Sequence, residues 1–337
     1  MVSFEHAPPE ARQLLPVRIR DLGLALESSP VAELVRRLYA ELEARGLRHF
    51  RPRCYLSDEW GSPTGEPVIG IPFYLGDPRV ATLEDALNDV EGEREIMMYL
   101  RHEAGHAFNH AYQLDRTAEW REIFGSVRRP YRDDYPFVPF SRDYVRYVPG
   151  WYAQKHPDED FAETFAVWLD RKTQWRKRYA AWGGAIRKLE YVDHITRALA
   201  DTPPPRAQGR IDITTDEMEK TVEETLREYH VDETAIIADL PLDADLLDIF
   251  TPTHESMSAA ADVLARHRRS LIDKVHDWTG VRRSLVRELV LAIELRLRDL
   301  QLHASREQML ELTVYITALS MTFLTGKRRL RHPRSAR

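Results

Sequence analysis

Residues 99–114, which read YLRHEAGHAFNHAYQL, decide how the first half of this chain folds. They carry the motif HEAGH at residues 102–106, inside a segment that reads as a helix. Side chains four residues apart share one helix face, so His102 and His106 can turn imidazole nitrogens toward one ion. Zinc suits such a pair, at bonds of about 2.0–2.1 Å. Glu103 projects from the adjacent position and can reach a water bound to that ion.

A catalytic zinc site needs a third protein ligand and an open position for water. The chain has one cysteine, Cys54, so a thiolate cluster is excluded and the third ligand must be a histidine or a carboxylate. The third histidine of the metzincins would fall at position 112, which is a tyrosine here. His110 lies one turn further along the helix, too far along its axis to share an ion with His102. A carboxylate from a second helix is the remaining route.

The sequence GWYAQKHPDEDFAETFAVWL, residues 150–169, predicts such a second helix. Pro157 suits the first helical position, and Glu159 and Glu163 follow one turn apart on the same face. Neighbouring alanines are small enough to let this helix approach the HEAGH helix closely. The helix macrodipole alone favours the acidic residues of the first turn, but Glu163 lies beyond that turn.

Together the two motifs resemble those of the gluzincin metallopeptidases, and most of all a bacterial family of zinc-binding metallopeptidases with an ExFAE-type second motif. The catalytic domain of anthrax lethal factor has a similar second helix. This resemblance covers about residues 50–172. It implies that Glu159 is the third zinc ligand and that Glu163 accepts a hydrogen bond from a ligand histidine, for which we expect His102. Thermolysin-like gluzincins carry an aspartate at the position of Glu163, and the exopeptidase motif of the aminopeptidases is absent.

The same pattern implies that a tyrosine seven residues before the glutamate ligand assists catalysis, which is Tyr152 in this chain. This assignment rests on spacing alone. Three other tyrosines compete for the role: Tyr112, Tyr144 and Tyr147.

For the fold, we expect an α+β, zincin-like metallopeptidase domain followed by a mostly α-helical region. A turn-rich stretch is followed at residues 68–75 by the β-type run VIGIPFYL, in which Pro72 favours an edge strand of a small sheet. Zincins receive their substrate as an added strand at such an edge, a general mode of peptide recognition. Residues 31–46 read as a further helix, and Gly92 separates the HEAGH helix from the preceding one.

A length of 337 residues suggests two domains. We place the metallopeptidase domain at residues 1–200, with its core at about 50–172. The stretch DTPPPRAQG, residues 201–209, reads as a linker. Residues 210–326 read as a helical domain that is a candidate for contact with a protein partner, and residues 327–337 as a basic tail.

Composition limits the classes of function. With 43% hydrophobic and 30% charged residues, a globular protein with a core is expected. The net charge of −6 gives no general attraction to nucleic acid. The N-terminal sequence lacks an apolar stretch, and the apolar run near residues 312–324 is too short to cross a bilayer, so we expect a cytoplasmic location and no membrane partner.

The function that these observations favour is a zinc-dependent peptidase acting on a peptide or protein, with Glu103 as the general base. An arginine-rich segment offers residues that could line a cleft for acidic substrates: Arg128, Arg129 and Arg132. Two alternatives stay open. One is a degenerate zincin-fold binding or regulatory protein with a structural metal, and the other is a zinc hydrolase of a non-peptide amide.

Overall fold

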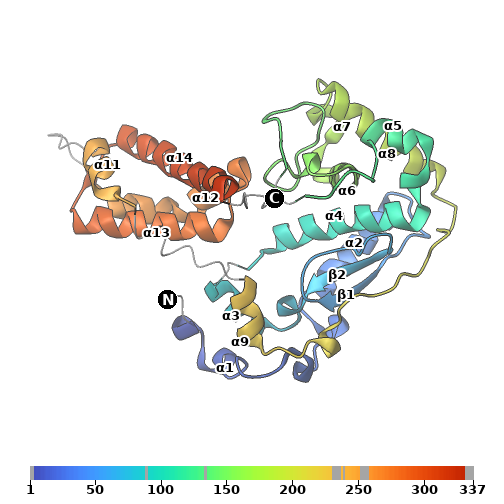
Figure 1. The fold of residues 1–337 in the computed structure, drawn as a ribbon, viewed down its shortest axis with the longest axis horizontal. Coiled ribbons are helices and arrows are strands. Elements are labelled where there is room, and N and C mark those ends of the chain that lie inside the picture. Colours follow the sequence, from blue (N-terminus) through green and yellow to red (C-terminus); the bar gives the residue numbers. More distant parts are fainter. Residues whose placement is uncertain are drawn as a thin grey trace, which may run out of the picture. The chain divides into compact units, whose positions relative to one another are not determined.

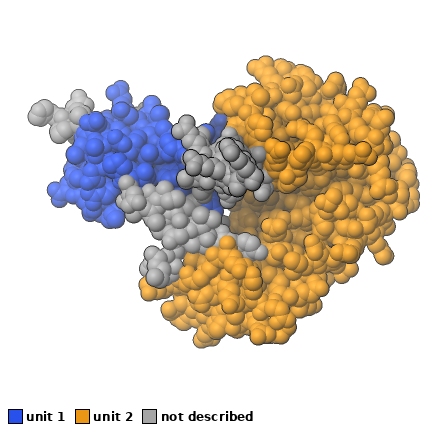
Figure 2. All heavy atoms as spheres, in the orientation of Figure 1, with its two compact units in different colours: residues 1–2, 230–337 blue, residues 3–229 orange. Residues whose placement is uncertain are grey.

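The computed structural model (Figure 1) divides into two compact units, residues 1–2 with 230–337 (unit 1) and Ser3–Tyr229 (unit 2), coloured separately in Figure 2. Unit 2 combines helices with a small sheet and is of the α+β class, whereas unit 1 is almost wholly helical. The structure describes residues 4–87, 90–132, 135–229, 237, 240–250 and 258–330.

The centre of unit 2 is helix α4, Glu93–Tyr112, which carries the HEAGH motif. It begins after Gly92, as predicted, and the Glu95 carboxylate accepts a hydrogen bond from the Gly92 N–H at 2.9 Å. From Leu100 to the end of the helix every residue is buried. Buried polar side chains usually have hydrogen-bonding partners, so Arg101 and the histidines of this helix need acceptors from neighbouring elements.

Helix α6, Pro157–Leu169, is the second predicted helix and packs directly on α4. Its approach is so close that a Cβ added at Gly105 would lie 2.7 Å from the Ala162 Cα and 2.9 Å from the Ala162 carbonyl oxygen. Glycine at the centre of HEAGH therefore sets the spacing between the two motif helices, together with the small residue that faces it.

We expect Gly105→Ala to lower the free energy of unfolding by about 1–3 kcal/mol, because the new methyl group would push the backbones of α4 and α6 apart in a packed core. Urea unfolding followed by tryptophan fluorescence measures the change. Gly183→Ala is the matched control, since a Cβ at Gly183 meets nothing within 4 Å. Equal midpoints for the two variants would contradict the close approach of α4 and α6.

The small sheet consists of two parallel strands, β1 (Arg53–Ser57) and β2 (Val68–Pro72). The other side of β2 is occupied at its centre, because Gly61 and Gly70 exchange backbone hydrogen bonds of 2.7 and 3.3 Å. Pro72 has no N–H to offer. The expected free edge at β2 is therefore closed at Gly70 by the preceding loop, a backbone pairing that its turn-rich sequence did not reveal.

The structure forms further helices in unit 2: α1 (Pro9–Arg12), α2 (Ala32–Ala44), α3 (Pro78–Leu87), α5 (Ala118–Phe124), α7 (Trp175–Arg178), α8 (Gly183–Ala198) and α9 (Val222–Tyr229). Helix α2 packs on α4 as α8 packs on α6. The buried Arg101 of α4 joins three elements, because its guanidinium bonds both Glu41 oxygens at 2.6 and 2.7 Å and an Asp170 oxygen at 3.3 Å. This network holds the end of α6 against α2 and α4.

Residues 201–229, read from the sequence as a linker and the start of the helical domain, belong to unit 2. The supposed linker packs on unit 2, where the Arg206 N–H donates to the Ala111 carbonyl at 3.1 Å and its guanidinium pairs with Glu66 at 2.5 Å. Further on, the Lys220 carbonyl accepts from the Ile19 N–H at 3.1 Å. The boundary falls after Tyr229, because these backbone and ionic contacts tie the whole segment to unit 2.

Unit 1 confirms the predicted helical character of the C-terminal region. A leucine-, isoleucine- and valine-rich core lies among its helices, and the buried Glu294 carboxylate is paired with Arg268 and Arg298. Residues 327–330 of the predicted basic tail belong to the last helix, and residues 331–337 lie outside the described part of the chain. The elements are α11 (Leu242–Ile249), β3 (Ser258–Ala259), α12 (Ala260–Thr279), α13 (Arg283–Asp299), β4 (His303–Ala304) and α14 (Arg306–Leu330).

In the part of the chain that the structure describes, no helix combines the length and the apolarity that a membrane crossing demands.

Candidate metal centre

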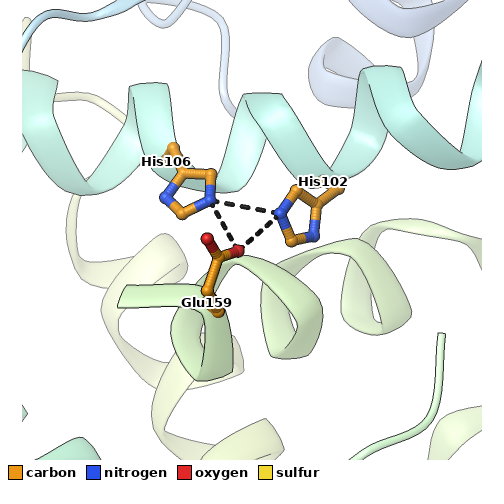
Figure 3. A group of neighbouring side chains, drawn as sticks. All are labelled: His102, His106 and Glu159. Carbon is orange, nitrogen blue, oxygen red and sulfur yellow. Dashed lines mark hydrogen bonds and ion pairs between the residues drawn. The ribbon is translucent and has the colours of Figure 1, made fainter. Parts of the chain in front are cut away.

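Three side chains converge between α4 and α6, as Figure 3 shows: His102 and His106 from α4 and Glu159 from α6. The two Nε2 atoms are 3.1 Å apart. Glu159 Oε2 lies 3.0 Å from the His102 Nε2 and 3.2 Å from the His106 Nε2. All three residues are buried, and within the described ranges they form the group that can hold a metal ion.

The chemistry of these atoms fits zinc. Ligand atoms around a tetrahedral zinc, at bonds of about 2.0–2.1 Å, lie roughly 3.3–3.4 Å apart, close to the observed triangle. The Nδ1 atoms of His102 and His106 face carboxylates, which can only accept, so each Nδ1 carries a proton. When such a ring is neutral, its Nε2 lone pair faces the centre of the triangle. Three inward-facing donor atoms repel one another unless a proton or a cation lies between them.

Protons compete with a cation for this position. Burial lowers the pKa of His102, but its hydrogen bonds to Glu159 and Glu163 outweigh burial and raise the pKa to about 9. Burial also opposes charge on His106, and the nearby Asp158 and Glu159 raise its pKa well above the usual value. The cluster thus attracts positive charge strongly, as a cation site must.

Glu163 lies where the sequence analysis expected it. Its Oε1 is 2.9 Å from the His102 Nδ1, and the side chain is completely buried. The Oε2 accepts backbone N–H groups of Tyr147 at 3.2 Å and Val148 at 2.9 Å. One carboxylate therefore fixes the orientation of His102 and also attaches the irregular segment before α6 to the site.

Asp158 accepts a hydrogen bond from the Nδ1 of His106, as Glu163 does from the Nδ1 of His102. The sequence analysis missed this role of Asp158. Its Oδ2 lies 3.0 Å from the His106 Nδ1, while its Oδ1 accepts from the Asn109 Nδ2 at 2.8 Å. The macrodipole had explained an acidic residue at this position without further roles. The sequence did contain an indication of this role. A metal-binding histidine usually donates its other ring N–H to an acceptor, and Asp158 is adjacent to Glu159.

Glu103 lies at the cleft beside the cluster but outside the triangle. Burial raises the pKa of its carboxyl group, and the neighbouring His102 and His106 oppose this. Among the described residues, no donor forms a hydrogen bond with its carboxylate. The position therefore suits an acceptor for a proton from a molecule in the cleft.

Of the tyrosines considered from the sequence, Tyr152 is the one at the cluster. Its hydroxyl lies 3.3 Å from the Glu159 Oε1, and its ring centre lies 5.6 Å from that of His102. The others have partners elsewhere: Tyr112 with the Thr202 carbonyl, Tyr144 with Lys188, and Tyr147 with Arg101 and Asp170. The sequence analysis missed a second phenol at the cluster, that of Tyr131, whose hydroxyl also donates to the Glu159 Oε1.

A cleft of about 590 Å³ opens onto the cluster. One wall is formed by the loop that covers β2, including Trp60, Gly61 and Gly65. Basic side chains also line the cleft. Of the three arginines proposed from the sequence, Arg129 lines it, whereas Arg128 and Arg132 do not. Apart from the two histidines of the cluster, the remaining basic side chains of the lining are Arg116, Arg206, His110 and His156.

Comparison with known proteins gives one finding. A family model described as "Putative zinc-binding metallo-peptidase" matches residues 79–229. No curated protein and no solved structure matches the chain. The matched region runs from α3 to α9 and holds both motif helices. This region of the chain, with its buried His102, His106 and Glu159, is therefore similar to the zinc-binding metallopeptidase family of that description.

Proposed function

We propose that the protein is a zinc-dependent peptidase of the gluzincin type, with His102, His106 and Glu159 as the zinc ligands. The observation that carries the proposal is the convergence of three donor atoms within 3.0–3.2 Å of one another, two of them histidine nitrogens whose opposite ring nitrogens are bonded to carboxylates. This ligand set belongs to catalytic zinc sites of the thermolysin kind, which leave one position for water.

The chemistry divides between the ion and the chain. Zinc, when bound, polarises a carbonyl group and lowers the pKa of water. Glu103 takes one proton from the water whose oxygen attacks the carbonyl carbon, and gives a proton to the leaving nitrogen as the carbon–nitrogen bond breaks. The Tyr152 hydroxyl donates to the oxygen on which negative charge develops. Glu163 and Asp158 keep His102 and His106 in the tautomer that this arrangement needs.

A structural zinc site in a degenerate scaffold is the weaker candidate. Such sites are closed by four protein ligands, whereas the described residues supply three. They also have no use for a buried carboxylate such as Glu103 beside the ion. Hydrolysis of a non-peptide amide would use the same residues, and the experiment on substrates decides between the two.

The cleft suggests which peptides bind. Arg116 and Arg129 line it, and neither guanidinium has a carboxylate partner among the described residues. Unpaired guanidinium groups attract carboxylates. We therefore infer that the substrate is a peptide with acidic residues near the cleaved bond.

Digestion of a peptide library by the full-length protein, after its metal content has been measured, tests the proposed function. We expect about one zinc per chain and cleavage that stops with chelator and returns with zinc. Cleavage sites should be enriched in aspartate and glutamate, and that enrichment should fall in Arg129→Gln but not in Arg128→Gln, whose side chain does not line the cleft. A zinc-loaded protein that cleaves no library peptide would contradict the proposal.

A further inference from the structure

The two oxygens of the Glu159 carboxylate have different neighbours. Oε2 faces the histidines, at 3.0 and 3.2 Å from their Nε2 atoms. Oε1 faces away from them and meets two phenols, those of Tyr131 and Tyr152. A carboxylate can bind a cation through one oxygen or through both, so the groups on Oε1 decide which of the two occurs.

The protons of the two phenols can be assigned by counting. Each phenol has one proton to donate and can also accept, whereas the carboxylate can only accept. Tyr131 makes the closer contact with Oε1, so its proton belongs to the carboxylate. The Tyr152 hydroxyl lies 3.3 Å both from Oε1 and from the Tyr131 oxygen, so its proton has two possible acceptors. Tyr152 can therefore turn its proton elsewhere while Tyr131 still holds Glu159.

Contacts from the start of α6 hold Tyr131 in place, although it lies far earlier in the chain. The carbonyl of Arg129 is 3.1 Å from the Nε2 of His156, whose Nδ1 caps α6 by accepting from the Asp158 N–H. The ring of Tyr131 lies 5.4 Å from that of His156. The Lys155 Nζ is 4.2 Å from the Tyr131 ring centre and 5.2 Å from that of Tyr152, so one cation contacts both rings.

We propose that Tyr131 is a positioning residue that holds Oε1 of Glu159, so that this carboxylate binds the ion through Oε2 alone. The inference rests on the proposed function in one respect, the identity of the three ligands. One-oxygen binding keeps the position that a water molecule needs. It also separates two tasks, because Tyr131 orients the ligand and Tyr152 is released to donate to the substrate.

The test compares the full-length wild type with Tyr131→Phe, which removes the hydroxyl and keeps the ring. We expect the zinc affinity, measured by competition with a chromogenic chelator, to fall about tenfold, within the 10–100-fold typical of residues that orient metal ligands. The cobalt-substituted variant should absorb visible light more weakly than the wild type, because a Glu159 bound through both oxygens raises the coordination number above four. Neither reading requires peptidase activity.

Two further variants separate positioning from a general effect on the segment. Tyr135→Phe removes a phenol of the same segment that bonds the Gly150 carbonyl at 2.9 Å, so affinity and spectrum should match the wild type. Tyr152→Phe should lower kcat and change zinc affinity far less than Tyr131→Phe. Unchanged zinc affinity and cobalt spectrum in Tyr131→Phe, or an equal change in Tyr135→Phe, would overturn the inference while leaving the proposed function in place. An inactive protein with the expected metal readings would overturn the proposed function alone.

Discussion

Glu103→Gln is expected to lower kcat for peptide hydrolysis by about 10²–10⁴-fold, the usual contribution of a general base, while zinc stays bound. The amide has nearly the shape of the carboxylate but cannot take a proton from water. Glu103 lies outside the triangle of His102, His106 and Glu159, so its charge is not needed to hold the ion. Steady-state kinetics on a cleaved library peptide and the zinc content per chain are measured on the same preparation.

The matched control is Glu93→Gln, the same change at the exposed start of the same helix, where Glu93 pairs with Arg37 at 2.7 Å. This variant should keep the activity of the wild type. If Glu103→Gln kept its activity, a different base would be required and the mechanism would be wrong. If it lost its zinc, Glu103 would be assigned to metal binding instead.

Much of the candidate site follows from local regularity. Within α4 the helical repeat places His102 and His106 on one face whatever surrounds the helix. Within α6 the same repeat relates Glu159 to Glu163. That the two helices lie together was predicted from the resemblance of their motifs to those of metallopeptidases. In the structure the predicted side chains lie within hydrogen-bonding distance of one another.

The parts that sequence reasoning missed lie in irregular segments. Tyr131 and Arg206 reach the site from stretches without a repeating pattern, so no periodicity indicates which way their side chains point. The proline-rich stretch before residue 209 has the composition of an exposed linker, yet the pairing of Arg206 with Glu66 fixes it to unit 2. Asp158 was overlooked for another reason, because an acidic residue in a first helical turn already has an electrostatic explanation.

A large loss of zinc affinity is expected from Glu159→Ala. Removing a ligand leaves the ion with two histidines, so the zinc affinity should fall by more than about 100-fold, beyond the 10–100-fold typical of residues that only orient ligands. Activity at ordinary zinc concentrations should disappear with the metal. Competition with a chelator gives the affinity, and circular dichroism verifies that the variant is folded.

A control for Glu159→Ala has to remove an acidic side chain without disturbing the fold. The neighbouring Asp160 is unsuitable, because its carboxylate pairs with Lys188 at 2.6 Å and both side chains are buried. Removing it would leave the buried charge of Lys188 without its carboxylate, at a cost of about 3–5 kcal/mol, and would mix loss of folding with loss of metal. Glu122→Ala, at an exposed position of α5, changes the charge equally and should bind zinc like the wild type. A folded Glu159→Ala protein with the zinc affinity of this control would remove Glu159 from the ligand set, and the gluzincin assignment with it.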